Sequence, residues 1–308
     1  MTLAVALKRW AFTLVPLVGL VELALHWKQT RDVVPDADWL AAREGVKAEL
    51  HDRDLVVFAP EWSDPLGRLF FGADIMTLGR AARPDATRFE RAFEVSMRGA
   101  HSAELSRWKK VAERRYGALT VTTLENPSFV PLKDDLVAQI GAKVVRVSRV
   151  DAAGETPCPW QHGVTQSGST YVPQGPAVPG DKFVCQGSYV GVGVLHDLDH
   201  RPRQCIFAGT IPGATLRIRF ADVAYGAVLH GHDGVQWVTD RTKAGDSVHI
   251  SFKAMGQEIG HHTHKPGTGW VGFELPMREL SGQHGELVVE VSARGQGQKQ
   301  FCFEADTR

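Results

Sequence analysis

Residues 214–220, Ala-Thr-Leu-Arg-Ile-Arg-Phe, alternate apolar and polar side chains along the chain. Successive side chains of a β-strand point to opposite faces, so Leu216, Ile218 and Phe220 would share one face and the intervening polar residues the other. This alternation predicts a strand with one face in a hydrophobic core and the other in water, which is typical of antiparallel sheets.

Short runs of the same kind recur through residues 155–308, where Gly and Pro separate them and helical periodicity is lost after Gly154. Many short strands joined by turn residues are typical of an all-β sandwich, and eight strands favour a jelly roll. We therefore expect residues 155–308 to form a jelly-roll β-sandwich. The expected strands are residues 204–208, 214–220, 226–230, 235–238, 247–252, 269–275, 285–292 and 299–304.

The end of this domain carries a more specific pattern. Residues 269–293, GWVGFELPMRELSGQHGELVVEVSA, and residues 301–308, FCFEADTR, resemble the last strands of galactose-binding-like jelly rolls. Domains of that family are common as carbohydrate-binding modules. The resemblance implies the jelly-roll fold and, less specifically, a glycan ligand, because a fold does not by itself determine function.

Cysteine usage bears on the compartment. The four cysteines, Cys158, Cys185, Cys205 and Cys302, all lie in the second half, and none forms a CxxC pair. Widely spaced cysteines in even number predict two disulfides if this domain lies outside the cytoplasm. Three connectivities are possible, of which we prefer Cys158–Cys185 with Cys205–Cys302. The alternative is four reduced, buried thiols.

A run of histidines raises the question of a metal site. His261, His262 and His264 form an HHxH pattern, and imidazole is a common zinc ligand. Gly260 and Pro266 bound the run, so the alternative is an exposed loop with ordinary polar histidines. Other side chains that could complete a site are His196, Asp197, Asp199, His200, His230, His232 and Asp233.

Residues 34–152 have a different pattern, in which helical and apolar runs alternate. The expected strands are residues 54–60, 93–97, 119–124 and 142–150, and the expected helices are residues 38–50, 86–92, 102–116 and 134–140. Helices alternating with continuous apolar strands predict a parallel α/β sheet. We therefore expect a Rossmann-like parallel domain before the sandwich.

Ligands of parallel sheets bind where the strands end, and the first expected strand runs into a distinctive loop. Glu61, Trp62, Asp64 and Arg68 would offer carboxylates, an aromatic face and a guanidinium to a sugar or a phosphate. The alternative is a structural loop in which Arg68 pairs with Asp64. No glycine-rich phosphate loop and no GxSxG motif follows a strand, so nucleotide binding and acyl transfer are unsupported.

The first half also resembles a known family. The motifs are DWLAAREGV at residues 38–46, DLVVFAPEWSDPLGRLF at residues 54–70 and FERAFEVSMRGA at residues 89–100. Together they resemble the soluble extracytoplasmic tail of multi-spanning bacterial glycosyltransferases that use lipid-linked sugars. Those enzymes place their catalytic acids between several membrane helices, whereas this chain has one apolar run. The resemblance therefore implies a shared domain and argues against transferase activity.

That apolar run is residues 10–27, WAFTLVPLVGLVELALHW. As a helix it would extend about 27 Å, close to the thickness of the hydrocarbon core of a bilayer. We expect residues 1–33 to be an uncleaved transmembrane anchor, with Lys8 and Arg9 in the cytoplasm. The rest of the chain would then lie in the periplasm, on the outer side of the inner membrane. A cleaved signal peptide and a buried helix of a soluble protein are the alternatives.

Glu22 and His26 lie one helical turn apart within this run. Ionisable side chains inside a membrane usually face protein, so this face could contact another membrane subunit. The alternative is simple solvation at the membrane interface.

The composition narrows the function. The formal net charge is zero and no basic stripe is present, so nucleic acid is not an expected partner. No catalytic constellation or cofactor motif is evident, so the sequence favours a protein that is not an enzyme. We expect a membrane-anchored, extracytoplasmic binding or accessory subunit of a bacterial membrane complex, in contact with lipid through its N-terminal helix. The alternative is a cell-envelope glycan-binding protein or a glycan-active enzyme related to glycosyltransferases.

Overall fold

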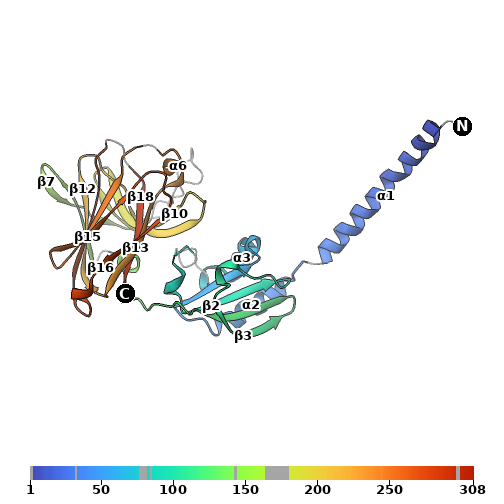
Figure 1. The fold of residues 1–308 in the computed structure, drawn as a ribbon, viewed down its shortest axis with the longest axis horizontal. Helices are drawn as coiled ribbons and strands as arrows, with labels where there is room; N and C mark the ends of the chain where they lie inside the picture. The colour runs from blue at the N-terminus through green and yellow to red at the C-terminus, as the bar shows by residue number, and fades with distance from the viewer. Residues whose placement is uncertain are drawn as a thin grey trace. The chain divides into compact units, whose positions relative to one another are not determined.

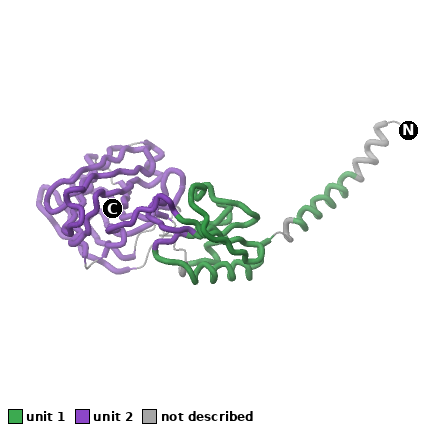
Figure 2. The backbone as a smooth tube through the Cα atoms, turned by 60° about the horizontal axis from the view of Figure 1, so that its bottom comes forward, with its two compact units in different colours: residues 1–52, 56–72, 93–125 green, residues 53–55, 73–92, 126–308 purple. Residues whose placement is uncertain are grey.

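The computed structural model describes the backbone of residues 3–31, 33–75, 82–83, 85–141, 144–163, 180–243, 245–295 and 299–308; side chains are described for these except residues 3–13, 29–31 and 73–75. The chain divides into two compact units (Figure 2). Unit 1 comprises residues 1–52, 56–72 and 93–125, and unit 2 comprises residues 53–55, 73–92 and 126–308.

The opening run forms helix α1 (Leu3–Arg31). Among the helices that the structure describes, none is both long enough and apolar enough to cross a membrane. The expectation of a transmembrane helix is thus contradicted for the residues that the structure describes, and the side chains of residues 1–13 and 29–32 of the expected anchor lie outside them. Glu22 and His26, both exposed, interrupt the apolar run, and ionisable side chains are costly to place in hydrocarbon. Their role as a partner-binding face is not tested by any contact in this chain.

Unit 1 also contains a small sheet in the order β1-β2-β4-β3. Its strands are β1 (Asp54–Ala59), β2 (Arg91–Met97), β3 (Lys109–Tyr116) and β4 (Leu119–Glu125), and its helices are α2 (Asp36–Lys47) and α3 (Asp64–Ile75). Trp39, Ala42 and Val46 form the buried face of α2, because residues three and four apart lie on one side of a helix. The Trp39 ring stacks on Phe70, with ring centroids 5.5 Å apart.

The expectation of a Rossmann-like parallel domain is wrong, as two segments show most clearly. The segment 102–116, expected to be a helix, contains only a short 3-10 turn (Ala103–Leu105) and strand β3, which pairs antiparallel with β4. Lys, Glu and Arg favour helices in isolation, but here they line an exposed edge strand, where charge discourages pairing with other chains. Strand β6 (Val145–Asp151), expected to complete this sheet, instead pairs with β12 (Thr215–Ala224) of unit 2.

Unit 2 consists mainly of two sheets (Figure 1). One has the order β16-β13-β18-β11-β10-β9-β8, with β5 paired to β18, and the other has the order β15-β14-β17-β12-β6-β7. The chain passes from one sheet to the other between successive strands from β12 to β14 and from β15 to β18, as in a jelly roll. The remaining elements are β5 (Asp134–Asp135), α5 (Leu136–Gln139), β7 (Gly154–Pro157), β8 (Trp160–Gln161), β9 (Lys182–Cys185), β10 (Ser188–His196), β11 (Pro202–Ala208), β13 (Val228–Val235), α6 (Trp237–Asp240), β14 (Val248–Ala254), β15 (Gln257–His264), β16 (Val271–Pro276), β17 (His284–Ala293) and β18 (Phe301–Thr307).

The core of this sandwich lies between the two sheets. Leu216, Ile218 and Phe220 of β12 are fully buried, and they belong to one hydrophobic cluster with Ile206 of β11 and Phe303 of β18. Burying a side chain of this size contributes about 2 kcal/mol. The alternation in residues 214–220 therefore correctly predicted an antiparallel strand and which of its faces is buried. The antiparallel β-sandwich is confirmed.

The two disulfides join the cysteine pairs that we preferred. Cys158 pairs with Cys185, with Cα atoms 4.7 Å apart, and Cys205 pairs with Cys302, with Cα atoms 5.7 Å apart. The second bridge links the neighbouring strands β11 and β18 within one sheet. All four side chains are buried. The two predicted disulfides are thus confirmed, and the alternative of four thiols is not what the structure shows.

Close packing at Gly231, on β13, provides a test of the sandwich. A Cβ atom added there would lie 2.5 Å from Cζ of Phe273 and 2.6 Å from the backbone oxygen of Glu304. We expect Gly231→Ala to lower the free energy of unfolding by about 2 kcal/mol, because a sheet backbone moves less easily than a flexible side chain. Gly141→Ala, where a Cβ atom would have no neighbour closer than 4.0 Å, is the control. Equal stability of the two variants in urea unfolding would contradict this packing.

Candidate ligand pocket

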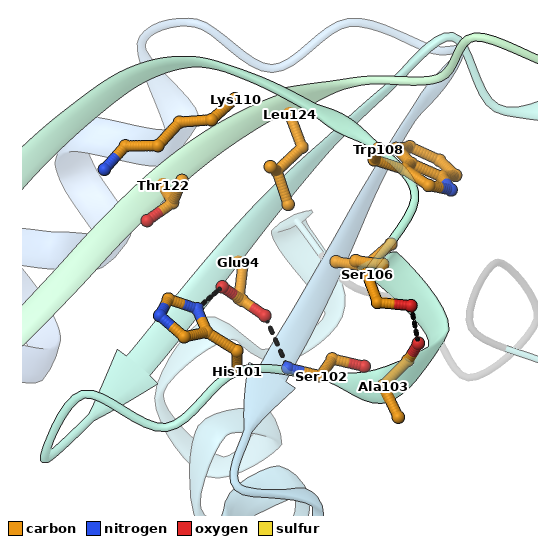
Figure 3. Close-up of a pocket in the computed structure, with 10 residues that line it drawn as sticks. Glu94, His101, Ser102, Ala103, Ser106, Trp108, Lys110, Thr122 and Leu124 are labelled. Atoms are coloured by element: carbon orange, nitrogen blue, oxygen red, sulfur yellow. Dashed lines mark hydrogen bonds and ion pairs between the residues drawn. The ribbon is translucent and has the colours of Figure 1, made fainter.

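A pocket of about 380 Å³ lies within unit 1, between the sheet and the segment that joins β2 to β3 (Figure 3). Strand β4 contributes Thr122 and Leu124, which share a face because they are two residues apart. Lys110 of β3 stands opposite Leu124 in the antiparallel register. The joining segment contributes His101, Ser102, Ala103, Leu105, Ser106 and Trp108.

Glu94 of β2 organises one end of the pocket. Its side chain is almost fully buried, and one carboxylate oxygen accepts a hydrogen bond from the backbone N–H of Ser102, at 2.6 Å. The other oxygen lies 2.8 Å from Nδ1 of the exposed His101 (Figure 3). Hydrogen bonds to an ionised carboxylate are among the stronger ones, so Glu94 holds the start of the joining segment and orients the His101 ring.

Thr122 supplies a hydroxyl whose hydrogen-bonding capacity is not used. The residue is 2 % exposed, and Oγ1 has no hydrogen-bond partner among the residues that the structure describes. Buried polar atoms in folded proteins nearly always have a partner. A polar group that enters the pocket and reaches Oγ1 would therefore gain a hydrogen bond without displacing an existing one.

The rest of the lining combines an aromatic wall with charges that are already paired. The Trp108 side chain lies on one side, near Leu124 and Ser106 (Figure 3). Lys110 forms an ion pair with Glu113 three residues along the same strand. Because Glu94 and Lys110 both have partners, the pocket offers hydroxyls, a ring face and an apolar patch rather than an unbalanced charge.

The loop that the sequence singled out lies elsewhere in unit 1. Arg68 donates from Nε to Oδ2 of Asp64 at 2.6 Å, one turn apart on α3, which is the structural alternative considered above. Trp62 is 64 % exposed and Glu61 is exposed, and neither lines the pocket. Ligand binding by Glu61, Trp62, Asp64 and Arg68 stays a prediction.

The histidine run is not an exposed loop but the end of strand β15, which pairs with β14. His264 is buried, with Nδ1 2.8 Å from Oδ1 of Asp233, and His262 lies 3.5 Å from the other oxygen of Asp233. His261 is exposed and lies 3.3 Å from Glu258. Across the described part of the chain, no group of three or more His, Cys, Asp or Glu side chains could hold a metal ion.

No known family and no curated protein matches the chain. Among solved structures, it is similar to a CBM51 module of a Clostridium perfringens GH95 protein in complex with methyl-galactose, at 14% identity and a TM-score of 0.26, covering 38% of this chain and 81% of that one. TmCBM61 in complex with β-1,4-galactotriose matches at 13% identity and a TM-score of 0.25, covering 36% and 80%.

A third neighbour is the structure of the CBM51-2 and INT domains of Clostridium perfringens ZmpB with GlcNAc. It matches at 12% identity and a TM-score of 0.29, covering 82% of this chain and 47% of that one. These neighbours contain carbohydrate-binding modules, but TM-scores this low establish neither a common fold nor a common ligand. The expected likeness of the first half to glycosyltransferase tails has no support among them.

Proposed function

We propose that this protein binds a neutral saccharide in the pocket of unit 1. The observation that carries the proposal is the buried, unpartnered hydroxyl of Thr122 in a pocket that also has an aromatic side chain, Trp108, among its lining residues. Sugars present hydroxyls on their edges and apolar C–H faces, so they combine hydrogen bonding with packing against a ring. The volume of about 380 Å³ lies in the range of small-molecule pockets and would hold one or two sugar units.

The charge pattern supports a neutral ligand and a binding role. Glu94 and Lys110 are each paired within the protein, so a charged ligand would find no free counter-charge among the described lining residues. Glu94 is also the one carboxylate among those residues. Most glycoside hydrolases need two carboxyl groups beside the scissile bond, so we propose binding rather than hydrolysis.

We also propose that the protein works in an oxidising compartment outside the cytoplasm. Two buried disulfides support this placement, because such bridges are rare in cytosolic proteins. The expected membrane complex and lipid contact have no support in the described contacts, and they form no part of this proposal.

Removal of one hydroxyl tests the pocket with little change of shape. Thr122→Val should weaken saccharide binding about tenfold, the loss expected for one buried hydrogen bond. Isothermal titration of the full chain with galactose, N-acetylglucosamine and galacto-oligosaccharides, which are all neutral sugars, would measure the change. Thr123→Val, one residue along β4 and outside the pocket lining, is the matched control. Equal affinities for the two variants would contradict the proposed site.

A further inference from the structure

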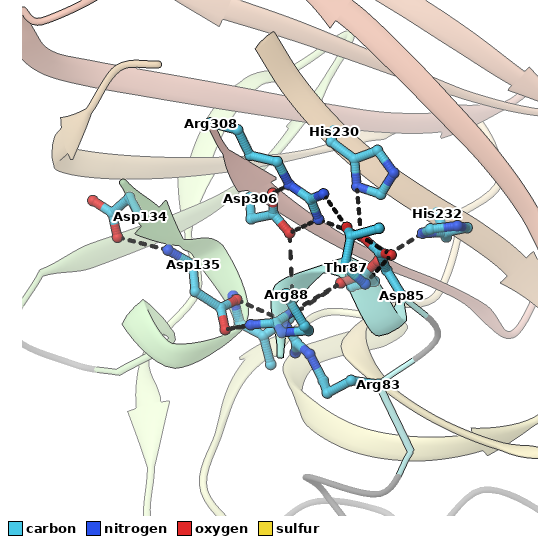
Figure 4. Close-up of polar contacts among 12 residues, drawn as sticks. Arg83, Asp85, Thr87, Arg88, Asp134, Asp135, His230, His232, Asp306 and Arg308 are labelled. Carbon is cyan, nitrogen blue, oxygen red and sulfur yellow. Dashed lines mark hydrogen bonds and ion pairs between the residues drawn. The ribbon is translucent and has the colours of Figure 1, made fainter. Parts of the chain in front are cut away.

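A short segment of unit 2, of which the structure describes residues 82–83 and 85–89, is attached to the sandwich by charged side chains (Figure 4). We call it the strap; it includes the 3-10 turn Ala86–Arg88. Two backbone hydrogen bonds anchor it, from the N–H of Gln204 to the oxygen of Ala82 at 3.1 Å and from the N–H of Val130 to the oxygen of Thr87 at 2.9 Å. The Asn126 side chain adds two more, from Nδ2 to the backbone oxygens of Ala86 and Phe89, both at 2.9 Å, and the remaining side-chain attachments are mostly charged.

Two buried arginines of the strap share one carboxylate. Arg83 donates from Nη2 to both oxygens of Asp135, at 2.8 and 2.9 Å, and Arg88 donates to Oδ2 of the same residue at 2.6 Å. Both guanidinium groups also approach Oε2 of the fully buried Glu304, at 3.4 and 3.6 Å. Asp135 therefore holds two strap cations at once.

A second contact has the opposite polarity. Asp85 of the strap accepts a hydrogen bond from Nη2 of Arg308 at 2.5 Å, and Thr87 accepts one from Nη1 of the same side chain at 2.7 Å. Arg308 is held in turn by both oxygens of Asp306. The strap is thus held through two of its own cations, Arg83 and Arg88, and through its own anion, Asp85.

The hydrophobic core does not hold the strap. None of the strap residues belongs to the main hydrophobic cluster of the sandwich, and only Ala82 and Phe89 are buried apolar side chains of the strap. Detaching the strap would expose Ala82 and Phe89 but no member of the main cluster, so the two sheets would stay packed. Its attachment therefore depends on charge, while the stability of the sandwich depends on the core.

We propose that the strap is an acid-released element. It detaches from the folded sandwich when the carboxylates of the charged cluster that attaches it take up protons. Protonation removes the counter-charges and leaves the largely buried guanidinium groups of Arg83, Arg88 and Arg308 to repel one another. The charged and titratable groups of this cluster come from four elements. They are Arg83, Asp85 and Arg88 from the strap, Asp134 and Asp135 from β5, His230 and His232 from β13, and Glu304, Asp306 and Arg308 from β18 and the residue after it.

The direction of the pH effect follows from the individual groups. Burial alone would raise the pKa of Asp85, but hydrogen bonds from the Thr87 backbone and from Arg308 lower it to about 2. Burial would also raise the pKa of Asp135, but the charges of Arg83 and Arg88 and their hydrogen bonds outweigh it and lower this pKa. A carboxylate with a lowered pKa stabilises the attached state above its ordinary pKa, and this contribution is lost as the pH falls from about 4 to about 2.

Two further groups contribute to the pH dependence of release. Burial, together with the charge of Arg308, lowers the pKa of His230, so protonation of this ring below its ordinary pKa also favours release. Asp306 acts in the opposite sense, because burial raises its pKa and the attached state binds its proton more readily. Release of the strap is therefore expected mainly in the pH range in which Asp85 and Asp135 take up protons.

Amide hydrogen exchange on the full chain tests this proposal at neutral pH. Asp135→Asn removes the charge but keeps an oxygen that can accept from the Val137 N–H, as Asp135 does now. We expect exchange in residues 85–89 to rise about tenfold, with exchange in β12 and β17 unchanged. Asp151→Asn, which removes the ion-pair partner of Arg149 outside the cluster, should change neither region.

The same measurement between pH 7 and about pH 2, corrected for intrinsic exchange rates, should show the strap losing protection before the sandwich strands do. Strap and strands that lose protection together, or a strap unaffected by Asp135→Asn, would overturn the proposal. If Asp135→Asn fails to fold, Arg308→Met, which removes the partner of Asp85, gives the same comparison.

Discussion

Replacing Cys205 and Cys302 together with alanine should lower the free energy of unfolding by about 5 kcal/mol. The bridge spans 97 residues, and the chain-entropy model assigns about 4.7 kcal/mol to a closed loop of that length. Both sulfurs also lie in a small buried cluster with Leu195 and Phe207, so their removal leaves a gap in packed surroundings. Urea unfolding followed by circular dichroism would measure the loss.

The other disulfide provides the comparison. Cys158 and Cys185 close a loop of only 27 residues, for which the same model gives about 3.6 kcal/mol. The double alanine variant of this pair should therefore be more stable than the first by about 1 kcal/mol. A smaller loss for the long loop than for the short one would show that the Cys205–Cys302 bridge does not constrain the unfolded chain as described.

The second large effect is expected at Asp240, at the end of α6. This side chain is fully buried and accepts hydrogen bonds from the backbone N–H groups of Gly267 and Gly269, at 2.5 and 2.8 Å. Asp240→Ala leaves both donors without an acceptor in the interior, which should cost about 3 kcal/mol of folding free energy. Thermal or urea unfolding of the full chain would measure it.

Asp199 is a suitable control for this substitution, because its side chain is exposed. Asp199→Ala should change the free energy of unfolding by less than about 0.5 kcal/mol. The buried His264 lies 3.8 Å from Asp240 and 2.8 Å from Asp233, so it connects this carboxylate to strand β13. Equal losses for the two variants would contradict a structural role for Asp240.

The sequence predicted the sandwich well because its strands have one wet and one buried face. Leu216, Ile218 and Phe220 sit where their alternation requires, and the cysteine pairing follows the same fold. The histidine run was harder to interpret, because an isolated HHxH pattern does not show which ring is buried. His264 is buried beside Asp233, a residue 31 positions away in the chain.

Unit 1 was harder to predict for a physical reason. Charged residues at 109–116 favour a helix when considered alone, but pairing with β4 makes them an edge strand. Strand β6 likewise looks like the next strand of the first domain and pairs in the second. Local patterns determine which segments are strands, whereas pairing partners depend on contacts distant in sequence.

The candidate pocket was missed for the same reason. Glu94, Trp108 and Thr122 come from two strands and a joining segment, and no sequence pattern marks them as a common site. The expected helix over residues 102–116 also concealed the turn that carries Ser102 and Ser106. An unpartnered buried hydroxyl such as that of Thr122 becomes visible only when its neighbours in space are known.

The most direct test of the proposed function is a two-dimensional ¹H–¹⁵N NMR titration of the full chain with galactose and N-acetylglucosamine. A saccharide bound in the pocket should cause saturable shifts of the Trp108 indole N–H and of the Thr122 backbone amide, with the signals of the sandwich strands unchanged. Absence of shifts at both positions with millimolar sugar, or saturable shifts confined to the sandwich, would contradict a saccharide site in unit 1.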